Sequence, residues 1–132
     1  MKLGLISDIH GNLQALERIL ATLDDNGVEM ILCAGDLVCY GADHEQVLRV
    51  LRERHIPCVV GNYDYAVAWD QPRASEKSSS LLTEPLKQAA LDWTKTHISV
   101  LFANMLNSPP PAECQGSHLK TAQKRLFWCS RC

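Results

Sequence analysis

The 132-residue sequence lacks several features that mark particular classes of protein. No stretch approaches the roughly 20 consecutive apolar residues of a membrane span, and the first residues do not show the basic and then apolar pattern of a signal peptide. The formal net charge is only −2, so the total charge does not favour nucleic acid as a partner. No internal repeat is present. We therefore expect one cytoplasmic domain with neither a membrane nor a nucleic-acid partner.

Charged residues and cysteines are unevenly distributed along the chain. Residues 1–97 contain nine Lys/Arg and fourteen Asp/Glu, whereas residues 98–132 contain four and one. The second segment also has three consecutive prolines and no periodic apolar pattern. We expect residues 1–97 to form the folded unit, with a mobile loop at about 70–82, and residues 98–132 to form an irregular basic tail containing Pro and Cys. In a reducing compartment the six cysteines are expected to be free thiols, with Cys33 and Cys58 buried.

Strand-like and helix-like patterns alternate in the first half of the chain. Apolar runs at 2–7, 30–34 and 56–60 predict strands, and apolar residues at helical spacing predict helices within 13–27 and 42–55. Thr83 is expected to cap a further helix, whereas His44 and His55, near the ends of the second helix, are expected in solvent. Strands separated by helices predict an α/β fold with a mostly parallel sheet covered by helices.

Each strand-like run is followed by polar side chains that can bind a ligand. Asp8 and His10 follow the first run, Asp36 follows the second, and Asn62 and Asp64 follow the third. The carboxyl ends of parallel strands line the crevice where α/β proteins bind ligands. The sequence therefore predicts that these side chains form one site.

The side chains at this predicted site favour a divalent metal ion. A mixture of carboxylate, imidazole and amide oxygen suits Mn²⁺, Zn²⁺ or Fe²⁺ better than Ca²⁺. A carboxylate such as Asp36 can bridge two ions about 3.5 to 4 Å apart, an arrangement used for in-line displacement at phosphorus. We expect two divalent ions, with Mn²⁺ as the first choice and Zn²⁺, Fe²⁺ or Ni²⁺ as alternatives.

Three sequence blocks carry a resemblance to a known family. The segments SDIHGN, AGDLV and VVGNYDYAV resemble the D-x-H, G-D and G-N-x-D blocks of the calcineurin-like metallophosphoesterases, in the same order. The similarity is greatest to the small bacterial and archaeal phosphodiesterase branch, in which G-D-L-V is followed by a Y-G segment. It covers about residues 1–97 and then ends abruptly, as in a truncated or frameshifted reading frame or a divergent tail.

The resemblance implies a role for each residue of the site. Asp8, His10 and Asp36 would bind one metal ion, and Asp36 would bridge to a second ion bound by Asn62. Asp64 would support the loop that carries Asn62. Metal-bound hydroxide would then hydrolyse a small phosphodiester or phosphomonoester, which makes the chain a phosphoric ester hydrolase.

Two departures from the family pattern affect this expectation. Tyr63 occupies a position where many members have a histidine that assists the leaving group, and its ordinary pKa near 10 makes it a poorer acid at neutral pH. The chain also has no G-H-x-H block to complete the two metal sites, and only His97 and His118 remain in its second half. We expect slow turnover, or substrates with good leaving groups.

Other functions stay open at the level of sequence. The chain could be an inactive metal-binding or regulatory remnant of the fold. Its tail could instead bind nucleic acid through its basic residues or zinc through Cys114, His118, Cys129 and Cys132, although this spacing matches no common zinc finger. An open sheet would leave an unpaired edge, through which the chain could form a homo-oligomer.

Overall fold

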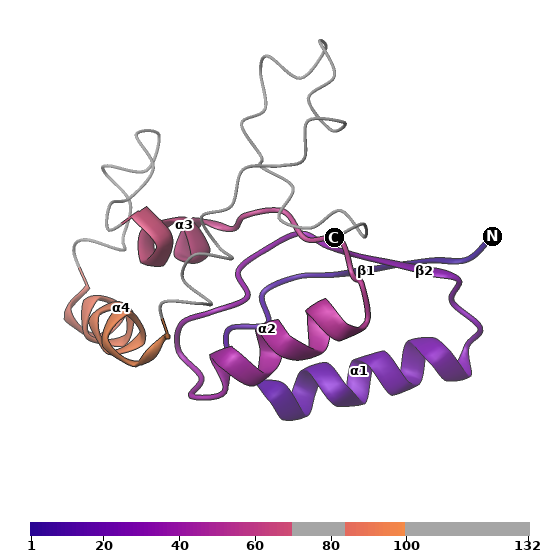
Figure 1. Ribbon diagram of the computed structural model, residues 1–132, viewed down its shortest axis with the longest axis horizontal. Coiled ribbons are helices and arrows are strands. Elements are labelled where there is room, and N and C mark those ends of the chain that lie inside the picture. Colours follow the sequence, from indigo (N-terminus) through magenta and orange to yellow (C-terminus); the bar gives the residue numbers. More distant parts are fainter. Residues whose placement is uncertain (70–83, 100–132) are drawn as a thin grey trace, which may run out of the picture.

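The computed structural model describes residues 1–69 and 84–99, which form an α/β arrangement (Figure 1). The elements follow in the order β1 (Leu3–Ile6), α1 (Leu13–Asp25), β2 (Met30–Cys33), α2 (His44–Glu53), α3 (Asn62–Trp69) and α4 (Pro85–His97). The predicted α/β class is confirmed. The loop expected at 70–82 and nearly all of the tail expected at 98–132 lie outside the described residues, so both remain predictions.

The two strands pair in parallel, as the sequence pattern predicts. Leu3 lies opposite Met30 and Ile6 lies opposite Cys33, so the pair is in register over all four residues of each strand. Helix α1 makes the crossover between them, and α1 and α2 lie together on one side of the strands (Figure 1). Both strands consequently end at the same edge of the sheet.

The strand predicted at 56–60 is much shorter than expected. This segment lies beside β2 but makes a single parallel bridge, between Cys58 and Cys33. The amide of Cys33 donates to the carbonyl of Pro57 and the amide of Val59 donates to the carbonyl of Cys33, each over 2.9 Å. Pro57 has no amide hydrogen to donate, so the ladder loses the hydrogen bond that would come before this bridge.

Helix α1 begins and is anchored as its sequence suggests. The side chain of Asn12 accepts a hydrogen bond of 3.0 Å from the amide of Ala15 and so caps the first turn. Leu16 and Leu20, one turn apart, are buried against the rest of the molecule.

Helices α2 and α4 differ from the prediction in detail. Asp43 stands at the N-cap position of α2, but its side chain makes no capping hydrogen bond and instead accepts one from Gln14 on α1. His44 was expected in solvent, yet it is buried, because its ring packs against Trp93 of α4. Helix α4 begins at Pro85, with Glu84 rather than Thr83 at the cap position.

Helix α3 was not foreseen from the sequence. It begins at Asn62, directly after the third apolar run, and it buries Tyr63, Ala66 and Val67. These three residues have the i, i+3, i+4 spacing of one helix face, but the helix is only eight residues long and largely apolar, so its periodicity is weak.

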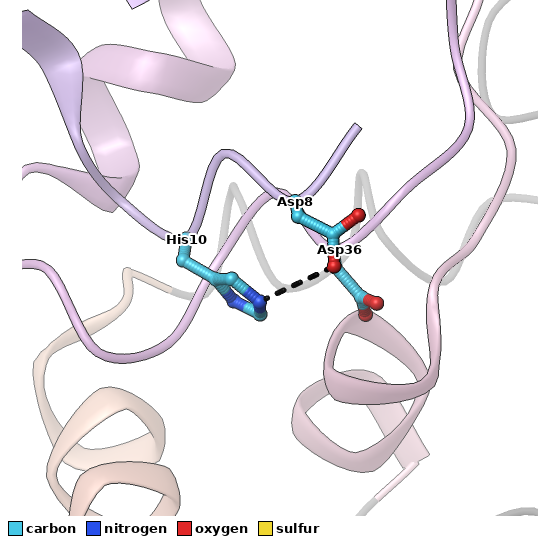
Figure 2. Close-up of side chains that lie close together, drawn as sticks. All are labelled: Asp8, His10 and Asp36. Carbon is cyan, nitrogen blue, oxygen red and sulfur yellow. Dashed lines mark ion pairs between the residues drawn. The ribbon is translucent and has the colours of Figure 1, made fainter. Parts of the chain in front are cut away.

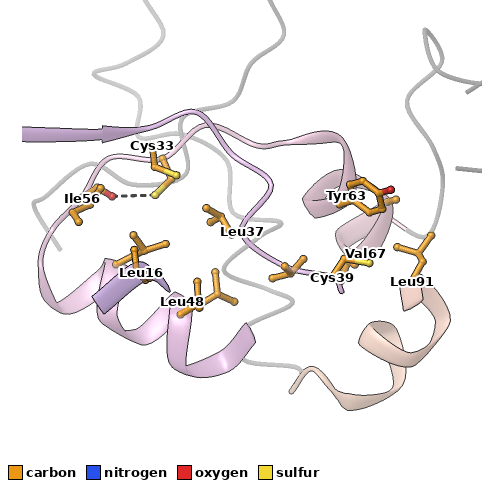
Figure 3. Packing of buried hydrophobic residues seen from close by; sticks show 14 of the residues in the cluster. Leu16, Cys33, Leu37, Cys39, Leu48, Ile56, Tyr63, Val67 and Leu91 are labelled. Atoms are coloured by element: carbon orange, nitrogen blue, oxygen red, sulfur yellow. Dashed lines mark hydrogen bonds between the residues drawn. The ribbon is translucent and has the colours of Figure 1, made fainter. Parts of the chain in front are cut away.

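The hydrophobic core lies between the helices and the loops that follow the strands (Figure 3). Cys33, Cys39 and Cys58 are buried free thiols, so the three cysteines of the described residues behave as small apolar side chains, as expected for Cys33 and Cys58. Leu3, Leu5 and Met30 on the two strands are exposed. Within residues 1–69 and 84–99, no helix has the length and apolar character needed to cross a bilayer.

Candidate metal centre

Pairing between the β1 and β2 segments continues past the ends of both strands. The amide of Asp8 donates to the carbonyl of Gly35 over 3.0 Å, and the amide of His10 donates to the carbonyl of Asp36 over 2.9 Å. The amide of Gly11 then donates to the carbonyl of Leu37 over 2.8 Å. These bonds hold the two loops side by side, so the polar residues that follow each strand face one another.

Asp8, His10 and Asp36 form the candidate metal centre (Figure 2). One potential ligand atom from each residue lies within 4.8 Å of the other two. Nε2 of His10 is 3.8 Å from Oδ1 of Asp8. The structure therefore brings together three of the residues that the sequence predicts as metal ligands, and two carboxylates with one imidazole are a suitable donor set for a divalent transition metal.

The imidazole of His10 is oriented by a backbone group. Its Nδ1 lies 3.1 Å from the carbonyl oxygen of Val38, which can only accept a hydrogen bond, so Nδ1 carries the proton. Nε2 is thereby left unprotonated in the neutral ring and faces Asp8. A hydrogen bond from one ring nitrogen to a carbonyl is the usual way in which proteins fix a metal-binding histidine.

All three residues have an unusual backbone conformation. The φ angles of Asp8, His10 and Asp36 are +55°, +50° and +57°, in the left-handed region that side chains other than glycine seldom adopt. Such conformations cost about 1–3 kcal/mol each and persist only where the surroundings enforce them. The hydrogen bonds between the two loops supply that enforcement and direct the three side chains to one point.

Asp64 connects the loop after β2 with the start of α3. Its fully buried carboxylate accepts four backbone hydrogen bonds, from Asp36 (2.9 Å), Leu37 (2.8 Å), Val38 (3.1 Å) and Gly61 (2.9 Å). Burial raises the pKa of Asp64 to about 6 against the lowering effect of the hydrogen bond from Gly61, and the neighbouring charge of Asp36 adds to the rise. A carboxylate that accepts hydrogen bonds from both segments has the geometry expected of a residue that supports these loops.

Asn62 and Tyr63 both contact the carboxylate of Asp36. The backbone amide of Tyr63 donates to Oδ1 of Asp36 over 2.9 Å. With its nitrogen toward Asp36, the side-chain amide of Asn62 donates to Oδ2 over 2.9 Å. If the side-chain oxygen of Asn62 faced Asp36 instead, Asn62 and the Asp36 carboxylate would share a bound cation. The orientation of the Asn62 amide therefore depends on whether a cation is present.

Two tyrosines enclose the ring of His10. The ring centroids of Tyr40 and Tyr63 lie 4.9 and 5.1 Å from that of His10, both edge-on, and the two hydroxyl groups are hydrogen-bonded to each other. Burial raises the pKa of Tyr63, and its hydrogen bond to Tyr40 raises it further. The sequence predicts a turn at Tyr40 and Gly41, with substrate contact as a lesser alternative, and gives no sign that Tyr40 approaches His10.

Close approaches of glycine residues bring the loops into contact. A Cβ atom on Gly11 would lie 2.6 Å from the carbonyl oxygen of Gly41, and one on Gly61 would collide with the backbone and the carboxylate of Asp36. Atoms cannot approach so closely without displacement, so only glycine fits at these points. The loops that carry the three metal-ligand candidates are therefore packed backbone to backbone.

Two aspartates and a histidine lie together at the carboxyl ends of parallel strands in this α/β fold. Such a site is typical of metal-dependent hydrolases. The Calcineurin-like phosphoesterase superfamily domain matches residues 1–125, nearly the whole chain, and the chain belongs to this family. The match extends beyond residue 97, where the resemblance in short motifs ends.

Individual relatives agree with this assignment. The chain is 42% identical to an uncharacterized protein of Methanocaldococcus jannaschii and 33% identical to a protein named bis(5'-nucleosyl)-tetraphosphatase, symmetrical, of Pectobacterium carotovorum. These alignments cover 82% and 72% of this chain and 42% and 37% of the relatives. A metallophosphoesterase from Sphaerobacter thermophilus superimposes with a TM-score of 0.59 at 28% identity, over 83% of this chain and 42% of its own. The chain thus spans about two fifths of the length of its relatives.

Proposed function

We propose that the chain is a metal-dependent phosphoesterase that hydrolyses small phosphodiesters or phosphomonoesters. The observation that carries this proposal is the convergence of Asp8, His10 and Asp36, whose ligand atoms lie within 4.8 Å of one another. Family membership supports the reaction class, and the metal dependence agrees with the name metallophosphoesterase of the solved relative.

Each residue of the site has a proposed role. Asp8, His10 and Asp36 would hold one divalent ion, and Asp36 and Asn62 would hold a second. Mn²⁺ is our first choice, with Zn²⁺, Fe²⁺ or Ni²⁺ as alternatives, because the donor set mixes oxygen with one nitrogen. When bound, a divalent ion supplies positive charge to the phosphate oxygens and lowers the pKa of water.

The remaining residues act on Asp36. The carboxylate of Asp64 accepts hydrogen bonds from the amides of Asp36 and of the two residues after it, and the amide of Tyr63 donates to one oxygen of Asp36. Asn62 sets the orientation of the other oxygen. The contacts from Asp64 and Tyr63 fix the direction of the Asp36 carboxylate before a ligand arrives, which reduces the reorganisation needed on binding, whereas Asn62 would turn its oxygen toward a second ion to hold it.

The substrate class is proposed from chemistry and from the name of one relative. The positive charge that bound divalent ions would bring to the site favours a phosphate ester, and the Pectobacterium relative is named for a dinucleoside tetraphosphate. We therefore propose a small phosphate ester as substrate, with nucleotide esters as the first group to test.

The test combines metal binding with hydrolysis. The purified chain is titrated with Mn²⁺ by calorimetry and then assayed with bis(p-nitrophenyl) phosphate, p-nitrophenyl phosphate and diadenosine tetraphosphate, with and without chelator. We expect turnover that chelator abolishes and that Asp36→Asn lowers at least about 100-fold, since removal of one key electrostatic group costs about that much. Asp25→Asn, the same change on the exposed end of α1, is the control. Turnover that survives either chelator or the Asp36 change would contradict the proposal.

A second function is a metal-binding protein without turnover. Three of the described residues could bind one ion. For a second ion, the ligands that we propose among the described residues are only Asp36 and Asn62. Calorimetric stoichiometry separates the two functions, because a two-ion hydrolase binds two ions per chain and a remnant binds one. The homo-oligomer through the exposed strand edge remains a prediction, to be checked by light scattering.

A further inference from the structure

Tyr40 is held beside the candidate metal centre by an unusual stretch of backbone. Cys39 and Tyr40 both have left-handed φ angles, of +80° and +63°. The Cys39 side chain is completely buried, and the next amide, that of Gly41, donates to the carbonyl of His10 over 2.8 Å. Two strained residues in succession require such fixation, and its effect is to place the Tyr40 ring against His10.

Tyr40 and Tyr63 differ in how much of each residue is exposed to solvent. Tyr63 is only 8% exposed, whereas Tyr40 is 47% exposed. Each hydroxyl has one proton to donate, and the single hydrogen bond between them uses one of the two protons. The remaining proton belongs to whichever tyrosine accepts.

Burial decides which tyrosine donates. If Tyr40 donated, the Tyr63 proton would be left without an acceptor among the described residues, on the more buried of the two residues, and an unsatisfied buried donor is costly. If Tyr63 donates, its proton is satisfied and the free proton is that of Tyr40, the more exposed residue.

We propose that the Tyr40 hydroxyl is the donor that contacts the substrate, giving its free proton in a hydrogen bond to an oxygen of a phosphate ester at the Asp8, His10 and Asp36 centre. Tyr63 is then a positioning residue that acts through Tyr40. This inference rests on the proposed function and adds to it a substrate contact by Tyr40, which the sequence offers only as the lesser alternative to a turn.

The experiment compares tyrosine-to-phenylalanine changes that remove one oxygen each. Tyr40→Phe and Tyr63→Phe are measured beside Tyr65→Phe, the same change on α3 outside the pair. The readouts are Mn²⁺ affinity, the affinity of the Mn²⁺-loaded chain for inorganic phosphate, both by calorimetry, and kcat and KM for bis(p-nitrophenyl) phosphate.

We expect Tyr40→Phe to weaken phosphate binding and to lower kcat/KM by about tenfold, as for the loss of one charge-assisted hydrogen bond, with Mn²⁺ affinity unchanged. Tyr63→Phe should cost about threefold, because the Tyr40 hydroxyl remains but is less firmly held. Once Tyr40 is phenylalanine, Tyr63→Phe should add nothing further. Tyr65→Phe should match the wild type.

Several results would overturn the inference. A large loss in Tyr63→Phe with none in Tyr40→Phe would make Tyr63 the direct donor. Equal loss of phosphate and Mn²⁺ affinity in Tyr40→Phe would mean that the tyrosine only supports the loop, and no change in either variant would remove the pair from the site. Failure of the wild type to bind Mn²⁺, Zn²⁺, Fe²⁺ or Ni²⁺ would refute the proposed function itself, and the role of Tyr40 with it, before any variant is compared.

Discussion

At the carboxyl end of the strands, Asp64 is fully buried and its carboxylate accepts four backbone hydrogen bonds, whereas at the opposite end Asp24 pairs with Arg54 in solvent. The Asp24 pair joins the ends of α1 and α2 through two hydrogen bonds of 2.8 and 2.6 Å. The same type of side chain thus organises backbone at one end and links two helix surfaces at the other. The site depends on the buried Asp64 carboxylate, which accepts the hydrogen bonds of loop amides in place of backbone carbonyl groups.

The glycines near the two ends of the strands also differ in how closely other atoms approach them. Gly61 touches the backbone and side chain of Asp36, whereas Gly27, after α1, has open space around it. Gly27 is required only for its φ of +64°, and Gly61 is required for the absence of a side chain. Packing at the site end therefore leaves less room for change than packing at the opposite end.

The largest expected effect is that of Gly61→Ala. The added methyl group would displace the Asp36 loop, so we expect the free energy of unfolding to fall by at least about 4 kcal/mol and Mn²⁺ binding to be lost. Gly27→Ala, which meets only backbone strain, should cost about 1 kcal/mol and leave Mn²⁺ affinity intact. Urea denaturation and calorimetry measure both, and equal losses in the two variants would contradict the difference drawn between the ends.

The next effect is that of Asp64→Asn. An amide can accept on one side only, so some of the four loop amides would be left buried without acceptors, and we expect a loss of about 3 kcal/mol in unfolding free energy. Mn²⁺ affinity should also fall, because the Asp36 loop loses its anchor. Asp24→Asn, the matched change at the opposite end, should leave Mn²⁺ affinity unaltered, and a fall there equal to that of Asp64→Asn would show that any lost carboxylate weakens the site.

The smallest effect concerns the pH dependence of the Asp24 pair. The hydrogen bond from Arg54 lowers the pKa of Asp24 below its ordinary value of 3.8. A lowered pKa in the folded state gives stability that is present above 3.8 and is lost as the pH falls through the lowered value. Asp24→Asn should therefore be slightly less stable than the wild type at neutral pH, and the difference should vanish in acid and shrink in high salt. Thermal unfolding of both proteins between pH 2 and pH 7 tests this, and a difference that grows in acid would contradict it.

Much of the site was predictable because it depends on local order in the sequence. Asp8, His10 and Asp36 follow strands whose apolar runs are plain, and parallel pairing brings their ends together. The metal-centre geometry therefore follows from two strands and one crossover helix.

Other features depend on contacts that sequence spacing does not encode. The third strand is reduced by Pro57, and buried His44 packs against Trp93 of α4, which is distant in sequence. Tyr40 reaches His10 only because two residues in succession adopt left-handed backbone. Such conformations are set by the packing of neighbouring loops, which periodicity cannot report.

The hydrogen bonds of Asp64 have a consequence for the order in which the molecule folds. The bond from Asp36 joins residues 28 positions apart, so it can form only after the intervening chain, which includes α2, has been gathered into place. Long-range contacts of this kind must overcome loop-closure entropy before they add stability. The arrangement that prepares Asp36 for a ligand consequently requires the chain as far as Asp64, and a chain halted after its first crossover would have both strands but would lack this anchor.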